Sequence, residues 1–348
     1  MRHLLQPESW DSLKSGLAER SQPAFRAAQI RKWVFEGRAE SFEAMSDLPK
    51  SLRADLAVEF QLWTSKVVRH LTSDDGTEKL LLELSDGGKI ECVLLREDDR
   101  RSICISTQVG CAMGCVFCAS GLDGVDRNLT SGEIVEQMLL LQRLLPEGER
   151  LSHIVVMGMG EPLANLDSLL PALDEASDET GLGISHRRIT ISTVGLPKQI
   201  HRLCELNTRY HLAVSLHAPS DELRNQIVPV NKNIGLADIL AAADRYFEVS
   251  GRRLTFEYVL LAGLNDQPQH ARELAARLRG RTALLNVIPY NPVAGLPYVT
   301  PSPGAINRFR DILIDAGINV KFRQRKGDAI NAACGQLRRS QPPLVTIG

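Results

Sequence analysis

Three cysteines lie within one short segment and are the residues best suited to chemistry. The segment reads Gln108-Val-Gly-Cys111-Ala-Met-Gly-Cys115-Val-Phe-Cys118, a CxxxCxxC pattern. Thiolates at this spacing can converge on one inorganic centre. Structural zinc normally takes four ligands, and the nearest downstream candidate for a fourth is His153. A four-iron cluster held by only three thiolates keeps one iron open to a substrate.

Two other interpretations of the same segment remain open. Cys115 and Cys118 alone form a CxxC pair that could do thiol redox chemistry, but this leaves Cys111 unexplained. A zinc site would need a ligand from a distant part of the chain. The spacing therefore favours an iron-sulfur cluster.

A glycine-rich segment, Met157-Gly-Met-Gly160-Glu161-Pro162, is the second candidate site. A dinucleotide-binding fingerprint would need a glycine at position 163, which is leucine. Free backbone groups beside a carboxylate suit the head group of an α-amino acid. The alternative is a plain turn from a strand into a helix, with Pro162 in the first helical turn.

The order of predicted elements divides the chain into four parts. Residues 1–58 show helical spacing of apolar residues, and residues 59–98 hold three β-rich runs that predict a β-meander. Residues 99–335 alternate strand-like and amphipathic segments, which is typical of βαβ units in an α/β protein with a parallel sheet. Residues 336–348 form a tail.

The strand-like segments of the alternating part are 102–107, 153–158, 187–193, 211–217, 254–261, 283–290 and 319–324. The first amphipathic segment starts with a capping box, Thr130-Ser-Gly-Glu133. Open sheets and (β/α) barrels both place their sites at the carboxyl ends of the strands. The cysteine segment and the Gly160-Glu161 turn each follow a predicted strand, so we expect them at the same edge of the sheet.

Composition indicates an ordinary globular protein. Of its residues, 43% are hydrophobic and 24% are charged. We find neither an apolar run of about 18 residues nor a signal-like segment at the start, so we expect a cytoplasmic protein without a membrane span. Cysteines in that compartment stay reduced, which argues against a disulfide framework and for metal or redox chemistry.

Net charge gives no general attraction to nucleic acid, since the formal charge is -1. A local excess does occur near the end of the chain. Between residues 308 and 339 there are eight basic and three acidic residues, an excess of five. This excess makes the stretch a candidate for contacts with nucleic-acid phosphates, and a solvated helix face is the alternative.

These motifs together resemble the radical S-adenosylmethionine (SAM) superfamily and, within it, the family of RlmN and Cfr RNA methyltransferases, nearer to the RlmN branch. The segments that carry the resemblance are CISTQVGCAMGCVFC, MGMGEPL, ITISTVG, LAVSLHAP, RNQIVPVNK, IPYNP and GDAINAACGQL. The resemblance implies a partial (β/α)6 radical SAM barrel with a small helical RNA-binding accessory domain at the N-terminus. It also implies a [4Fe-4S] cluster, and SAM as methyl donor and radical source.

The resemblance also assigns residues to the two cofactors. Cys111, Cys115 and Cys118 match the cluster ligands. The positions that match SAM contacts are Gly160, Glu161, Ser192, Ser215, Leu216, His217 and Asn291.

Two further cysteines match the family's methyl-transfer machinery. Cys334 matches the cysteine that carries the methyl group, and Cys104 matches the cysteine that releases the product by forming a transient disulfide. Glu91 matches the general base, and the alternative for it is an exposed strand residue. Cys92 and Cys204 match nothing in the family, and we expect both to be packing residues.

The function implied is methylation of carbon 2 of an adenosine in 23S ribosomal RNA, with transfer RNA as a further candidate substrate. Methylation of carbon 8, as in the Cfr branch, and a non-catalytic RNA-binding module stabilised by zinc or a cluster are the alternatives. Flavodoxin or ferredoxin is the expected electron donor, and we expect a monomer.

Lys326-Gly-Asp328 stands where the family usually has Arg-Gly-Asp, and Asn331 stands in place of a more usual Asp. These departures bear on how RNA is placed, because Lys cannot bind a phosphate in a bidentate fork.

Overall fold

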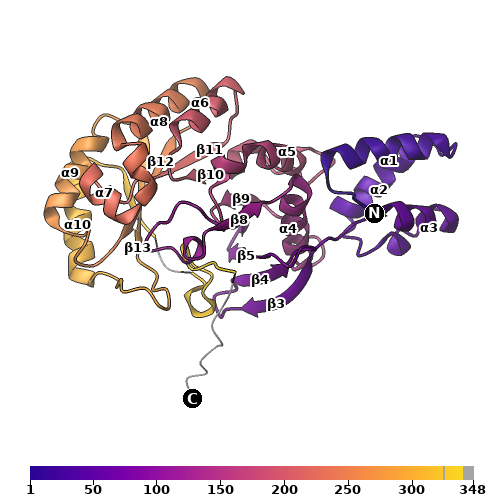
Figure 1. Cartoon of the computed structure of the whole chain (residues 1–348), viewed down its shortest axis with the longest axis horizontal. Coiled ribbons are helices and arrows are strands. Elements are labelled where there is room, and N and C mark those ends of the chain that lie inside the picture. Colours follow the sequence, from indigo (N-terminus) through magenta and orange to yellow (C-terminus); the bar gives the residue numbers. More distant parts are fainter. Residues whose placement is uncertain (324–325, 340–348) are drawn as a thin grey trace, which may run out of the picture.

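The computed structural model describes residues 1–323 and 326–339, and Figure 1 shows three helices at one end of a large sheet. These helices are α1 (Pro7–Glu19), α2 (Phe25–Phe35) and α3 (Lys50–Glu59). Two short strands, β1 (Arg2–His3) and β2 (Phe60–Gln61), pair in parallel and close this helical unit at its base.

The predicted β-meander is confirmed. Its strands are β3 (Lys66–Thr72), β4 (Glu78–Glu83), β5 (Lys89–Glu97) and β6 (Arg100–Cys104), and each pairs antiparallel with the next. Strand β6 also pairs in parallel with β9, so the meander and the parallel part of the chain form one ten-stranded sheet.

The parallel part contains every strand that the alternating pattern predicts. After β6 come β9 (His153–Val156), β10 (Ile189–Thr193), β11 (His211–Ser215), β12 (Leu254–Leu260), β13 (Ala283–Pro289) and β14 (Val320–Phe322). Each is parallel to its neighbour in chain order. Position 324, the end of the last predicted strand, lies outside the described residues.

Helices follow the strands and cover the sheet, as Figure 1 shows. They are α4 (Ser131–Arg143), α5 (Leu166–Ser177), α6 (Pro197–Glu205), α7 (Asp221–Ile227), α8 (Leu236–Ser250), α9 (Pro268–Leu278) and α10 (Pro303–Asp315). Short 3-10 turns lie at Phe42–Ala44, Pro162–Asn165, His186–Arg188, Pro229–Asn233 and Asp328–Ile330. The predicted α/β fold class, a partial (β/α)6 barrel, is confirmed.

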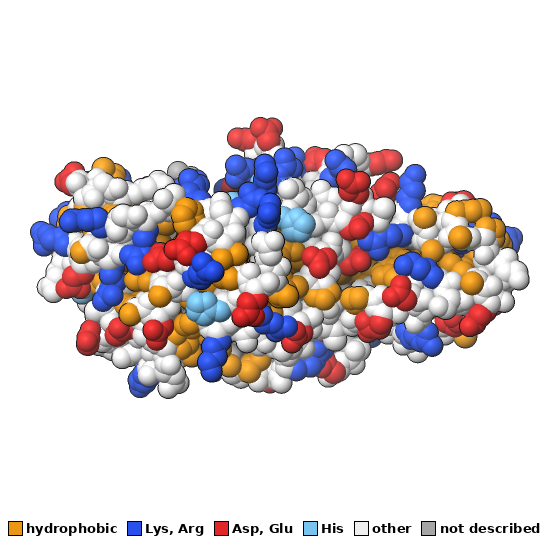
Figure 2. Space-filling model, turned by 90° about the horizontal axis from the view of Figure 1, so that it is seen from above, with side chains coloured by type: hydrophobic (Ala, Val, Ile, Leu, Met, Phe, Trp, Pro, Cys, Tyr) orange, Lys and Arg blue, Asp and Glu red, His pale blue; other side chains and the backbone are white. Residues whose placement is uncertain are grey.

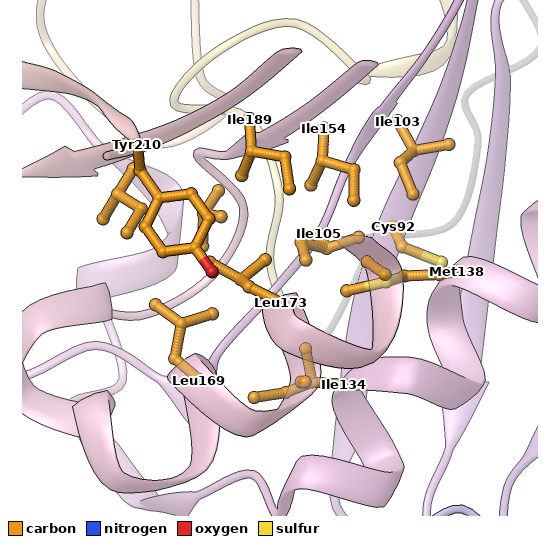
Figure 3. Packing of buried hydrophobic residues seen from close by; sticks show 14 of the residues in the cluster. Cys92, Ile103, Ile105, Ile134, Met138, Ile154, Leu169, Leu173, Ile189 and Tyr210 are labelled. Carbon is orange, nitrogen blue, oxygen red and sulfur yellow. The ribbon is translucent and has the colours of Figure 1, made fainter. Parts of the chain in front are cut away.

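Helix α4 starts at the predicted capping box. The Thr130 side chain accepts a hydrogen bond from the Glu133 amide, and the Glu133 carboxylate accepts one from the Thr130 amide. Figure 3 shows the layer that this helix forms with α5 against the sheet, in which Met138 lies next to Cys92 and Ile154 next to Ile105. Cys92 is fully buried there, so its predicted packing role is confirmed.

Buried polar contacts join the helical unit to the rest of the chain. The Glu136 carboxylate of α4 accepts hydrogen bonds from the backbone amides of Thr64 and Ser65, at distances between 2.9 and 3.1 Å. The Gln142 side chain donates to the Phe35 carbonyl at 2.8 Å.

Domain boundaries at residues 58, 98 and 335 remain our proposal. Within the described residues, no helix is long and apolar enough to cross a membrane.

Candidate active site

The three-cysteine segment is the loop of a small hairpin that follows β6. The hairpin strands are β7 (Gln108–Gly110) and β8 (Val125–Asn128), and the Cys111 amide donates to the Gly124 carbonyl at 2.8 Å. On the other side, the Val116 amide donates to the Ile227 carbonyl at the end of α7, at 3.0 Å. The loop is thus held where it leaves the hairpin and again near its middle.

The three thiols lie close enough together that a negative charge on one affects the pKa of another. Burial raises the pKa of Cys111 to about 12 and also raises the pKa values of Cys115 and Cys118. Negative charge on one thiol further raises the pKa of another, since Cys118 acts on Cys111 and both act on Cys115. Metal ligation would have to displace these protons.

In the part of the chain that the structure describes, no group of three or more His, Cys, Asp or Glu side chains is gathered around one metal position. Thiolates that hold a four-iron cluster bind different iron atoms, so the cluster requires a wider spacing than one zinc ion does.

The Gly160-Glu161 turn packs directly against the hairpin. Gly160 has φ +105°, and a Cβ atom there would lie 2.7 Å from the Gln108 Cβ, so only glycine fits. The Glu161 amide donates to the Gln108 side-chain oxygen at 2.8 Å. The Glu161 carboxylate accepts from the Thr193 hydroxyl at 2.7 Å and from the Val194 amide at 2.8 Å. Its orientation toward the end of β10 is therefore fixed.

Three of the other predicted SAM residues lie at the carboxyl ends of neighbouring strands. Ser192 is the second-last residue of β10, and Ser215 is the last residue of β11; both are half-buried. Leu216 is fully buried in the hydrophobic core, and its amide donates to the Glu257 carbonyl at 3.0 Å. The Leu216 side chain thus packs in the interior.

His217 is held in an uncommon backbone conformation, with φ +59°. Its Nδ1 accepts a hydrogen bond from the Val259 amide at 3.0 Å, which places the proton of the neutral ring on Nε2. Burial, followed by the nearby Arg224 guanidinium, lowers the pKa of His217 to about 3. The Phe117 ring of the cysteine loop meets the imidazole edge to face, with centroids 4.9 Å apart.

Asn291 connects the strand ends to the C-terminal segment. Its Nδ2 donates to the Cys334 carbonyl at 3.1 Å. Its Oδ1 is buried and accepts no hydrogen bond from the described residues. A buried acceptor of this kind normally has a donor, so a ligand N–H or O–H fits this position.

The C-terminal segment carries Cys334 across the cysteine loop. The Ala119 amide donates to the Gly335 carbonyl at 2.7 Å, and the Ser120 hydroxyl donates to the Leu337 carbonyl at 2.6 Å. Figure 1 shows this last segment lying beside strands far earlier in the chain. The fold thus brings residue 334 back to the loop after β6.

Cys334 lies close enough to two of the other predicted site cysteines to affect their pKa values. A charge on Cys334 raises the pKa of Cys104, whose value of about 12 is due first to burial, and it also raises the pKa of Cys118. All three are free thiols in the structure. Arg323 donates to the Cys334 sulfur at 3.7 Å. The predicted disulfide between Cys104 and Cys334 remains a prediction.

Glu91 is not the exposed strand residue that the alternative reading required. It is 1% exposed and forms an ion pair with Lys79, whose Nζ lies 2.9 Å from Glu91 Oε1. The Arg338 amide donates to Glu91 Oε2 at 3.0 Å. The carboxylate therefore contacts the segment that carries Cys334.

Besides Lys79, two buried charged residues near the site were not among the predicted residues. Arg224 is fully buried and donates to the carbonyls of Val194, Ser215 and Leu216, which end strands β10 and β11. Glu257 in β12 is 5% exposed. Arg224 lies in the segment RNQIVPVNK, but its residue type alone gives no sign of burial.

Several residues of the predicted basic patch have partners within the protein. Lys326 Nζ lies 3.2 Å from Glu97 Oε1, and Arg339 forms an ion pair with Asp126. Arg325 lies outside the described residues. On the face shown in Figure 2, basic and acidic side chains are interspersed. RNA contacts by this patch remain a prediction.

Comparisons with known proteins agree with this site. The curved parallel sheet and the three-cysteine loop after its first strand define a radical SAM enzyme. The model of the radical SAM superfamily matches residues 105–275, and the model of the ribosomal RNA large subunit methyltransferase N-terminal domain matches residues 9–62.

Individual relatives show to which family within this superfamily the chain belongs. A "probable dual-specificity RNA methyltransferase RlmN" from Rhodopirellula baltica is 66% identical over 96% of this chain and 90% of that protein, and one from Symbiobacterium thermophilum is 47% identical over 95% and 90%. The crystal structure of a radical SAM methyltransferase from Sphaerobacter thermophilus superposes with a TM-score of 0.93 at 44% identity, covering 98% of this chain and all of that one. The chain therefore belongs to the RlmN family of radical SAM RNA methyltransferases.

Membership of this superfamily implies a [4Fe-4S] cluster and SAM as cofactors. The residues present fit both groups. Three half-buried cysteines share one loop, and the open acceptor on Asn291 suits a polar ligand at the adjacent strand ends.

Proposed function

We propose that this enzyme methylates carbon 2 of an adenosine in 23S ribosomal RNA, at the peptidyl-transferase centre, and acts on transfer RNA as a second substrate. The observation that carries the proposal is the position of Cys334. Hydrogen bonds to the cysteine loop hold the segment that contains Cys334. A charge on Cys334 raises the pKa values of both Cys104 and Cys118, so its sulfur lies near both. The names of the relatives support RNA as the substrate.

The chemistry explains why two additional thiols are needed. Carbon 2 of adenine is electron-poor, so it does not attack a sulfonium methyl group directly. When bound, the cluster and SAM supply the methyl group and the radical. Cys334 would then hold the one-carbon unit and deliver it to the ring, and we assign removal of the ring proton to Glu91. Attack of the Cys104 thiolate on the Cys334 sulfur would form an S–S bond as the bond from that sulfur to the one-carbon unit breaks, and the freed carbon would take up a proton to become the methyl group of the product.

We assign the cofactor contacts to the residues predicted from the sequence. Cys111, Cys115 and Cys118 would hold the cluster. The SAM residues would be Gly160, Glu161, Ser192, Ser215, Leu216, His217 and Asn291, with Leu216 acting through packing because its side chain lies in the core.

The remaining partners follow from the reaction. A cluster that must be reduced needs an electron donor such as flavodoxin or ferredoxin. A ribosomal substrate places the enzyme in the cytoplasm, and we propose that it acts as a monomer.

Mass spectrometry of ribosomal RNA tests the proposal directly. RNA from cells with and without this gene would be digested to nucleosides, with 2-methyladenosine resolved from 8-methyladenosine. We expect 2-methyladenosine to disappear on deletion and to return with the wild-type gene. Loss of 8-methyladenosine instead would refute the carbon 2 assignment.

A further inference from the structure

A buried ion pair links the meander to the segment that carries Cys334. Lys79 on β4 and Glu91 on β5 are each 1% exposed, and Lys79 Nζ lies 2.9 Å from Glu91 Oε1. The strands are antiparallel neighbours, with Lys79 opposite Val93 and Glu91 opposite Leu81. The two side chains thus meet diagonally across one strand pair.

Both members of the pair also bind the C-terminal segment. Lys79 Nζ donates to the Asn331 carbonyl at 2.9 Å, and Glu91 Oε2 accepts from the Arg338 amide at 3.0 Å. Cys334 lies between these two points, three residues after the first and four before the second. The pair therefore holds the segment on both sides of the cysteine.

Stability alone is a poor explanation for this arrangement. Burial lowers the pKa of Lys79, against the attraction of Glu91, and the neighbouring Arg69 lowers it further. Removing two charges from water costs free energy that their attraction often only balances, and apolar residues of similar size would serve as well. A buried pair that also bonds a functional segment has a second use in fixing the position of that segment.

We propose that Lys79 is a positioning residue of the methyl-transfer reaction, whose buried ammonium holds the Cys334 segment and the Glu91 carboxylate in one fixed arrangement. This inference rests on the roles proposed above for Cys334 and Glu91. The ammonium pairs with the Glu91 carboxylate, which in turn contacts the segment. Without it, the Asn331 carbonyl loses this donor and Glu91 loses this ion pair, so the segment is held less firmly.

Hydrogen exchange of the segment tests this inference without any need for turnover. In the full-length enzyme with its cluster, we expect Lys79→Met to raise amide exchange in peptides covering residues 331–338 by about tenfold or more, because local opening becomes easier. Lys79→Arg keeps the charge and should restore part of the protection. Lys89→Met is the matched control: Lys89 pairs with Glu83 on the same two strands, but at 3.5 Å and with side chains that are 42% and 38% exposed, so exchange should not change.

A second variant covers the case in which Lys79→Met does not fold. The double variant Lys79→Met, Glu91→Met removes both charges of the pair, and it should show the same raised exchange. If exchange at 331–338 stays at the wild-type level in the folded variants, or rises equally in β9 to β13, Lys79 has no positioning role.

The mass of the purified protein gives an independent readout. Lys79→Met should carry much less methyl group on Cys334 than wild type at equal iron content, with Lys89→Met as wild type. Full methylation of Lys79→Met would overturn the inference. If wild-type Cys334 itself is never methylated, the proposed function fails, and the exchange result still decides whether Lys79 holds the segment.

Discussion

Glu257 is a buried carboxyl group near the site, and its pKa can be tested through the pH dependence of stability. It lies in the middle of β12, is 5% exposed, and accepts a hydrogen bond from the Asn286 side chain at 2.7 Å. Burial raises the pKa of Glu257 to about 7, although Arg323 and the Asn286 bond act in the opposite direction. Arg323 in turn contacts the Cys334 sulfur, so this carboxyl group belongs to the surroundings of the methyl carrier.

The sign of the effect on stability follows from the raised pKa. The ordinary value for this carboxyl is 4.5, so between pH 4.5 and about 7 the folded protein binds a proton that the unfolded chain has lost. Stability therefore falls as the pH rises through this range. At about 1.4 kcal/mol per pKa unit, the full cost above pH 7 is about 3 kcal/mol.

Glu257→Gln removes the charge while keeping an oxygen that can accept the Asn286 bond. Urea unfolding at matched cluster content should show the variant more stable than wild type by about 3 kcal/mol near pH 8.5, and by less than about 1 kcal/mol near pH 5. Glu248→Gln is the control, since Glu248 is exposed and pairs with Arg245 within the same helix at 3.1 Å. An advantage of equal size at both pH values would show that a raised pKa of Glu257 is not its cause.

Three further predictions concern ligands and RNA. Replacing Cys111, Cys115 or Cys118 with Ala should abolish iron content and visible absorbance together, because two thiolates cannot hold the cluster; full iron loading in any of these variants would contradict the ligand assignment. Asn291→Ala removes a buried acceptor and should weaken SAM binding, measured by calorimetry, by about tenfold, since a hydrogen bond is worth about 1 kcal/mol or more; unchanged binding would remove Asn291 from the SAM site. Lys326→Glu should weaken RNA binding and reduce the slope of log affinity against log salt by about one, and an unchanged slope would mean that Lys326 meets no phosphate.

Much of the fold could be predicted because its signals are local. Runs of β-branched and aliphatic residues between amphipathic segments predict the strands of the parallel sheet, and the capping box at Thr130 predicts the start of α4. The short strands β1, β2, β7 and β8 were not predicted, since two to four residues carry no recognisable period.

The site was predictable where motif and strand end coincide, as at Cys111 and Gly160. The burial of Lys79 and Arg224 was not, because each is a cation whose partners lie elsewhere in the chain. Which residue of the C-terminal segment meets the Lys79–Glu91 pair depends on the register of β4 and β5 and on the path of the chain after β14. Sequence spacing does not encode either.

In the proposed mechanism, Cys334 carries the one-carbon unit and Cys104 releases it. The decisive experiment uses protein with Cys104→Ala, purified from cells and run on denaturing gels with and without nuclease. We expect a slow-moving protein–RNA adduct that nuclease shifts, and no adduct when Cys334→Ala is present alone or in combination. If Cys104→Ala gives no adduct while still producing deoxyadenosine from SAM, the methyl-cysteine route is wrong for this enzyme.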